Sequence, residues 1–85
     1  MILDGSAWWK GEMITGKQAK AAREALGWSR PRLSARAAVS DLTIKRFEEG
    51  HRPAIRKIVA IERALEAAGI EFLEFEPGAR MRQEG

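Results

Sequence analysis

The chain has 85 residues, with 15 Lys or Arg, 12 Asp or Glu, one His and no Cys, for a formal net charge of +3. This length fits one small domain, and the lack of Cys excludes a disulfide framework, a zinc knuckle and an iron–sulfur cluster. No run approaches the ~18 apolar residues of a membrane span, and the N-terminus lacks the pattern of a secretory signal. We therefore expect a cytoplasmic protein that requires no metal or cofactor.

The charge is distributed unevenly along the chain. Residues 17–57 carry eleven basic and four acidic residues, for a net charge of +7, whereas residues 58–76 carry one basic and five acidic residues, for −4. A concentrated basic block favours a polyanionic partner such as nucleic acid. From charge alone, a solvated helical surface of mixed charge stays open as the alternative.

The chain begins with a segment that lacks a helical pattern and continues with a predicted helix. Residues 1–12 are expected to form a flexible extension, although Trp8 and Trp9 leave open an arm that packs across a dimer. Thr15 is a good N-cap for a helix over 16–26, which is rich in helix-forming residues and is followed by Gly27. Its narrow apolar stripe consists of Ala19, Ala22 and Leu26.

Two short helices joined by a tight turn are predicted next. Ser29 caps a helix that ends near Ala38, and Ser40 caps a helix over about 41–49 that Gly50 ends. Pro31 is tolerated because the first turn of a helix has no N–H partner to lose. The inward-facing residues are Leu33, Ala37, Ile44 and Phe47. This is the pattern of a helix-turn-helix, whose second helix lies in the DNA major groove.

A fourth helix and a short strand pair are predicted for the rest of the chain. The helix covers about 54–68, and its buried face is formed by Ile55, Ile58, Ile61 or Glu62, and Leu65. Residues 70–75 are expected to form a strand and 79–82 a returning strand; such a hairpin must pack on the helices or pair with a second chain. The predicted core is Leu26, Leu33, Val39, Ile44, Phe47, Ile58, Ile61 and Leu65, with Trp28 half-buried between the first two helices.

The exposed face of the third helix carries groups that can read DNA. Arg46 can donate two hydrogen bonds to guanine, Lys45 can reach a phosphate or guanine, and Leu42 can touch a thymine methyl group. Asp41 can accept from cytosine or simply favour the helix N-terminus, and the two readings stay equally open. The hydroxyls of Ser40 and Thr43 are candidates for phosphate contacts.

This segment resembles the XRE family of phage-repressor and Cro-like helix-turn-helix regulators, over about residues 14–75. The resemblance is carried by Gly27, Ser29, Leu33, Val39-Ser40, Thr43-Ile44, Phe47-Glu48, Gly50 and the run 64–72. It implies an all-α, lambda-repressor-like bundle of four to five short helices with a helix-turn-helix, plus a short C-terminal β-strand or hairpin. Members of the family dimerise on palindromic operators and repress transcription.

Four positions depart from the family pattern. Arg30 replaces a Gln that bridges a phosphate and the recognition helix, so a phosphate contact is expected but the amide bridge is in doubt. Arg32 replaces an acidic capping partner and is expected to face the DNA backbone. Ala38 stands where Gly is usual, which costs about 1 kcal/mol if this residue has φ > 0. Ser34 replaces a small Ala.

The family also places the loop after the third helix near the DNA backbone or minor groove. The matching residues are His51 and Arg52, and a solvated loop is the alternative for His51. Arg56 and Lys57 are candidates to support the same phosphate track, whereas Lys17, Lys20 and Arg23 are expected to be surface charge.

We therefore expect a DNA-binding transcriptional regulator with an extension at 1–12, a helix-turn-helix domain at 13–69 and a C-terminal segment at 70–85 that is a candidate for dimerisation. The function predicted is that of a dimeric repressor on a palindromic operator, and the alternative is the antitoxin of a toxin–antitoxin pair with a small protein partner. No nucleophile–base pair or metal set can be named, so an enzyme is not predicted.

Overall fold

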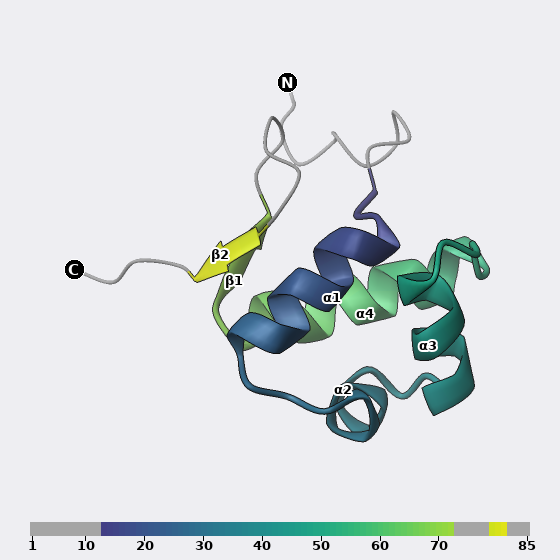
Figure 1. Ribbon diagram of the computed structural model, residues 1–85, viewed down its shortest axis with the longest axis horizontal. Coiled ribbons are helices and arrows are strands. Elements are labelled where there is room, and N and C mark those ends of the chain that lie inside the picture. The colour runs from purple at the N-terminus through teal and green to yellow at the C-terminus, as the bar shows by residue number, and fades with distance from the viewer. Residues whose placement is uncertain (1–12, 73–78, 82–85) are drawn as a thin grey trace.

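Four helices and a short antiparallel strand pair form the described part of the chain (Figure 1). The computed structural model of the chain describes residues 13–72 and 79–81. The elements are α1 Gly16–Ala25, α2 Arg30–Ala37, α3 Asp41–Glu48, α4 Ile55–Ala67, β1 Ile70–Phe72 and β2 Ala79–Met81. The expected helical bundle with a C-terminal hairpin is confirmed, whereas the predictions for residues 1–12, 73–78 and 82–85 lie outside the described residues.

The hairpin packs on the helices. In β1 and β2, Ile70 is opposite Met81 and Phe72 is opposite Ala79. Both strands lie against helices, β1 on α4 and β2 on α1, and Ile70 is fully buried. Packing on α1 and α4 therefore supplies the support that an isolated hairpin would lack.

The three predicted N-caps are confirmed. The Thr15 hydroxyl oxygen accepts from the Gln18 N–H at 3.1 Å, and the Gln18 side chain accepts from the Thr15 N–H at 2.8 Å. The Ser29 hydroxyl oxygen accepts from the Arg32 N–H at 3.2 Å, and Ser40 caps α3 in the same way. Each cap satisfies a backbone donor that the first turn of a helix leaves without a partner.

The core lies where the four helices meet, and it corrects two sequence predictions. The fully buried large side chains are Leu33, Ile44, Phe47, Ile58, Ile61, Leu65 and Ile70. Leu26 is only partly buried, because it is the C-cap at the edge of α1. Ile55 was predicted to be buried but is 61% exposed. It is the first residue of α4, and the apolar stripe that enters the core begins one turn later at Ile58.

Gly16 allows α1 to approach α3 closely. A Cβ atom at Gly16 would lie 1.7 Å from the carbonyl oxygen of Phe47, which no rotation of a side chain can relieve because this oxygen is backbone. The start of α1 and the end of α3 therefore touch at a position that only glycine permits.

The turn between α2 and α3 places a non-glycine residue in the left-handed region. Ala38 has φ 58° and ψ 40°, which confirms the conformation that the family's glycine implied. The Ala38 and Val39 N–H groups both donate to the Ser34 carbonyl, and the Ser34 hydroxyl donates to the Val39 carbonyl. Ser34 thus has a role in the turn that Ala could not fill.

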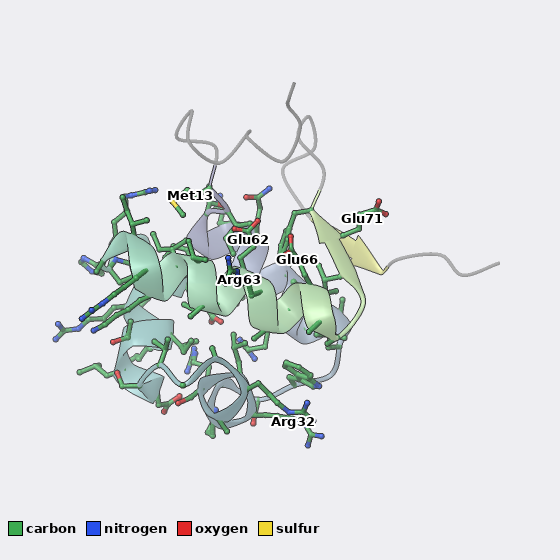
Figure 2. The ribbon with its side chains drawn as sticks, turned by 180° about the vertical axis from the view of Figure 1, so that it is seen from behind. Met13, Arg32, Glu62, Arg63, Glu66 and Glu71 are labelled. Atoms are coloured by element: carbon green, nitrogen blue, oxygen red, sulfur yellow. The ribbon has the colours of Figure 1, made fainter. Side chains whose placement is uncertain are left out.

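Two acidic side chains lie one turn apart on α4, at a distance from the helix-turn-helix (Figure 2). Burial, together with the charge of Glu66 and a hydrogen bond to it, raises the pKa of Glu62 to about 6, against the opposing effect of the Arg63 charge. A carboxyl group that ionises less readily when folded binds its proton more tightly in the folded state than in the unfolded chain.

Ala38→Gly is expected to stabilise the protein by about 0.5–1 kcal/mol. Relief of about 1–2 kcal/mol of left-handed strain exceeds the roughly 0.5–1 kcal/mol of extra chain entropy that glycine loses on folding. Urea unfolding measures the difference. The matched control is Ala35→Gly in the exposed interior of α2, which should cost about 1 kcal/mol. A loss of stability in both variants would contradict the left-handed assignment.

The stabilising contribution of the Glu62 proton should be present at low pH and lost as the pH rises through about 6. Relative to Glu62→Gln, the wild-type chain should therefore lose stability between about pH 5 and pH 7, by on the order of 1 kcal/mol after solvent screening. Urea unfolding of both chains at the two pH values tests this. A stability difference that does not change with pH would contradict it.

Candidate nucleic-acid interface

The third helix presents a short face of polar and apolar side chains to solvent. Asp41, Lys45 and Arg46 are exposed, and Leu42 is 54% exposed. On the opposite side, Ile44 and Phe47 enter the core, as predicted. Because residues three and four apart share a face of a helix, the exposed set forms one continuous surface. Its width suits the major groove of B-DNA, which admits one helix.

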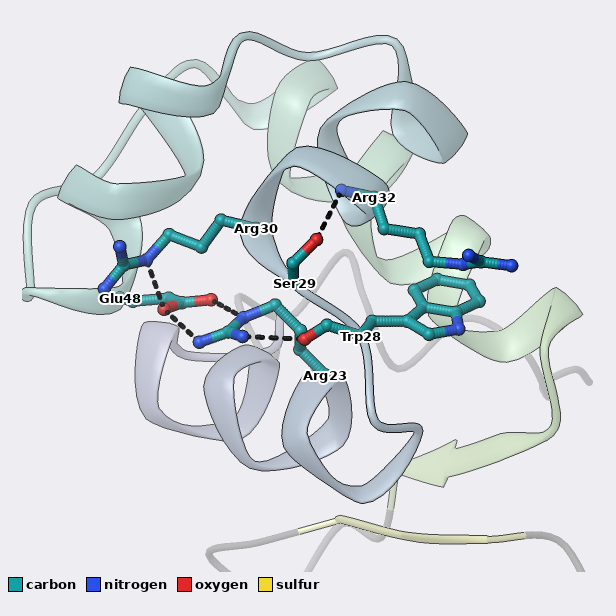
Figure 3. Close-up of polar contacts among 6 residues, drawn as sticks. All are labelled: Arg23, Trp28, Ser29, Arg30, Arg32 and Glu48. Carbon is teal, nitrogen blue, oxygen red and sulfur yellow. Dashed lines mark hydrogen bonds and ion pairs between the residues drawn. The ribbon is translucent and has the colours of Figure 1, made fainter.

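A buried carboxylate at the end of α3 holds this helix in place (Figure 3). The side chain of Glu48 is 2% exposed and accepts from two arginines of other helices. Arg23 of α1 donates from Nε to Glu48 Oε2 at 2.7 Å and from Nη2 to Oε1 at 3.1 Å. Arg30 of α2 donates from Nε to Oε1 at 3.2 Å. One carboxylate thus joins α1, α2 and α3.

Arg23 corrects a sequence prediction. It was expected to be surface charge, but it is 8% exposed, and its Nη1 also donates to the Trp28 carbonyl at 2.9 Å. The hydrogen bonds and charge of Glu48 raise the pKa of Arg23 above its ordinary value despite its burial. The sequence does contain a signal for the Arg23–Glu48 pair. Arg23 is next to Ala22 and four residues after Ala19, so it borders the apolar stripe of the first helix, where an arginine needs a buried partner.

Arg30 stands where the family has a Gln that contacts the recognition helix, and it still makes a contact to α3. The family's amide bridge is replaced by an ion pair between the Arg30 guanidinium and Glu48. The Arg30 side chain is 40% exposed, so its remaining N–H groups face solvent beside α3. The residue can therefore hold α3 and still donate to a phosphate.

At the other end of α3, Ser40 and Thr43 form a local network. The Ser40 oxygen accepts from the Thr43 N–H at 3.1 Å, and its hydroxyl donates to the Thr43 oxygen at 2.8 Å. The Ser40 proton is therefore committed to the cap. The Thr43 hydroxyl keeps its own proton, which is the one available to a phosphate oxygen.

The loop after α3 adds further basic groups beside the start of α1. Gly50 has φ 107°, and the N–H of His51 donates to the Arg46 carbonyl at 2.9 Å, which turns the chain back at the end of α3. His51 and Arg52 are exposed. A hollow opens between this loop and α1, lined by Thr15, Gly16, Lys17, Phe47, Glu48, Glu49, Gly50, His51 and Arg52.

Arg32 does not lie with the other predicted residues. Arg30 and Arg32 leave α2 in opposite directions, Arg30 toward Glu48 and Arg32 over the ring of Trp28 (Figure 3). In the view from behind, Arg32 projects from the side of α2 that faces away from α3 (Figure 2). The other predicted residues lie on α3, at its two ends or on the adjacent α2, and they are Arg30, Ser40, Asp41, Leu42, Thr43, Lys45, Arg46, His51 and Arg52.

A comparison with known protein families identifies the family to which these helices belong. A family model described as helix-turn-helix matches residues 20–72, which is more than half of the chain. The chain belongs to the XRE family of helix-turn-helix DNA-binding proteins. In this XRE protein the match spans α2, the turn and α3, together with α4 and β1. No curated protein matches the chain.

The family match agrees with the arrangement of its helices. The mostly helical fold is that of a lambda-repressor-like domain, and the family's domain binds DNA. Within the described parts of this XRE protein, no helix has the length and apolar character needed to cross a bilayer.

Glu48→Gln is expected to destabilise the XRE protein by about 3 kcal/mol, because it leaves the buried Arg23 guanidinium without a counter-charge. The matched control is Glu49→Gln, the exposed neighbour, which should change stability by less than about 0.5 kcal/mol. Urea unfolding followed by circular dichroism measures both. Equal effects of the two variants would contradict the structural role of Glu48.

Proposed function

We propose that the protein is a sequence-specific transcriptional regulator, a cytoplasmic dimeric repressor that reads a palindromic operator through α3. The observation that carries the proposal is the exposed face of Leu42, Lys45 and Arg46 on a helix held by the buried Glu48. Among the described residues, ion pairs occupy Arg23 and Arg30 but not Lys45 or Arg46. The cations of α3 are thus available to an external anion.

Base and backbone contacts are divided among the elements. Arg46 and Lys45 read guanine or bind phosphate, Leu42 contacts a thymine methyl, and Asp41 accepts from cytosine or favours the helix N-terminus. The backbone contacts lie near the two ends of α3. They are the Ser40 backbone N–H and the Thr43 hydroxyl at its start, and Arg30 of α2 with His51 and Arg52 near its end. Affinity should fall with salt with a slope of about −0.9 for each phosphate neutralised.

Dimerisation follows from the two-fold symmetry of such operators and from the small core. Two copies of α3 about 34 Å apart would enter successive major grooves on one side of the duplex. We propose the C-terminal hairpin as the dimer element, since the described part of the sheet has two strands and a second copy could extend it.

A second candidate function is that of an antitoxin, which binds DNA and also a small protein partner. The observation that favours it is the same strand pair, since a strand of another protein could extend so small a sheet. Co-purification of a small partner that protects β1 and β2 from hydrogen exchange would support it. A purified chain that forms only homodimers when co-expressed with its genomic neighbours would oppose it.

Arg46→Ala should weaken binding to the best DNA site by about 1–3 kcal/mol and relax the base preference at one position of each half-site. The control is Lys20→Ala, which removes the same charge from an exposed position on α1 and should leave the base preference intact. Fluorescence anisotropy with specific and random duplexes measures both. An equal loss on the two duplexes would make Arg46 a phosphate contact only.

Binding of the wild-type chain to its best site should also weaken steeply between about 50 and 200 mM salt. Affinity that does not change over this range would contradict DNA as the ligand of this face.

A further inference from the structure

The outer side of α2 carries a cluster that the DNA interface does not use. Trp28 is half-buried at the start of this helix-turn-helix, and Arg32 and Arg36 are exposed one helical turn apart. The guanidinium carbons of Arg32 and Arg36 lie 5.9 Å and 5.4 Å from the centre of the Trp28 ring. We call these three residues the Trp28 cluster.

The Trp28 cluster holds two charges close together without an acidic neighbour. Neither guanidinium has a carboxylate within salt-bridge distance among the residues that the structure describes. α2 contains three arginines and no acidic residue. Contact with the indole face orients each guanidinium, while its N–H groups stay available at the edge for an external acceptor.

The cluster lies on a different side of the molecule from the DNA interface. Arg30 turns toward α3, whereas Arg32 turns away from it and over Trp28 (Figure 3). A major groove occupied by α3 would therefore lie on the other side of α2 from Arg32. The Trp28 cluster also differs chemically from the exposed face of α3, because an aromatic ring lies at its centre. Trp and Arg are among the residues most enriched at the energetic centres of protein–protein interfaces.

We propose that the Trp28 cluster is a docking surface for an acidic segment of another protein. Its partner would present two carboxylates about 6 Å apart, which matches the rise between residues 32 and 36 of a helix. Two acidic side chains four residues apart on a helix have this spacing. Each carboxylate would accept two N–H groups from one guanidinium, and an apolar side chain between them would cover the indole.

The test is a titration of the full-length ¹⁵N-labelled chain with an alanine-based helical peptide that carries glutamate at every fourth position. The same peptide with glutamine is the ligand control. The side-chain N–H signals of Trp28, Arg32 and Arg36 should shift with the glutamate peptide alone. Arg32→Ala with Arg36→Ala should weaken peptide binding about tenfold or more, which corresponds to about 1.4 kcal/mol.

Two further variants separate geometry from charge. Lys17→Ala with Lys20→Ala removes the same charge from exposed positions on α1 and should leave peptide affinity within about twofold. Arg32→Lys with Arg36→Lys keeps the charge but loses the planar, bidentate donors, and should recover only part of the affinity. Circular dichroism confirms that each variant retains its helices.

Three results would overturn the proposal. An equal loss of peptide affinity in the α1 variant would mean that only net charge matters. Displacement of the peptide by duplex DNA, with DNA binding weakened in the Arg32 and Arg36 variant, would assign the cluster to the DNA interface. Shifts of the same signals with protein concentration alone would assign it to a second copy of the chain. None of these depends on whether α3 reads a specific sequence.

Discussion

The bundle depends on one buried carboxylate. Glu48 lies at the end of α3 with a side chain that is 2% exposed, and it receives three guanidinium N–H groups from Arg23 and Arg30. A buried charge is costly unless its geometry is nearly complete, so the three helices have little freedom to shift relative to one another. The Trp28 carbonyl takes a further N–H of Arg23, which adds the turn before α2 to the same network. The orientation of α3 therefore follows from a buried pair, Glu48 and Arg23, and from Arg30 at the surface beside them.

The basic residues of the chain divide into groups with different tasks. Arg23 and Arg30 neutralise Glu48, Lys45 and Arg46 lie on the exposed face of α3, and Arg32 with Arg36 surrounds Trp28. The net charge of residues 17–57 therefore does not tell how many of their basic side chains are available to contact DNA. Glu48 cancels one of the two positive charges of Arg23 and Arg30, so this group adds one net charge, not two, to the field that attracts a phosphate.

Local signals predicted the helices and the turn well, because caps and breakers act over three or four residues. Thr15, Ser29 and Ser40 were identified as N-caps from their own positions, and the structure confirms all three. Non-local contacts could not be predicted in this way. Arg23 pairs with a residue 25 positions away.

Two other features also depended on tertiary arrangement. The exposure of Ile55 depends on where the core ends rather than on helical spacing. Arg32 lies away from the proposed interface because its guanidinium packs over the ring of Trp28. The sequence alone indicated only that Trp28 is a half-buried packing residue.

The central claim is that the exposed face of α3, positioned by Glu48, reads a specific DNA sequence. The most direct measurement is in vitro selection of bound duplexes from a random pool with the full-length chain, followed by sequencing. We predict enrichment of a palindrome whose half-sites are centred about 10–10.5 base pairs apart, and loss of one preferred base in each half-site for Arg46→Ala. A pool that stays random after selection, or a motif that Arg46→Ala leaves unchanged, would contradict it.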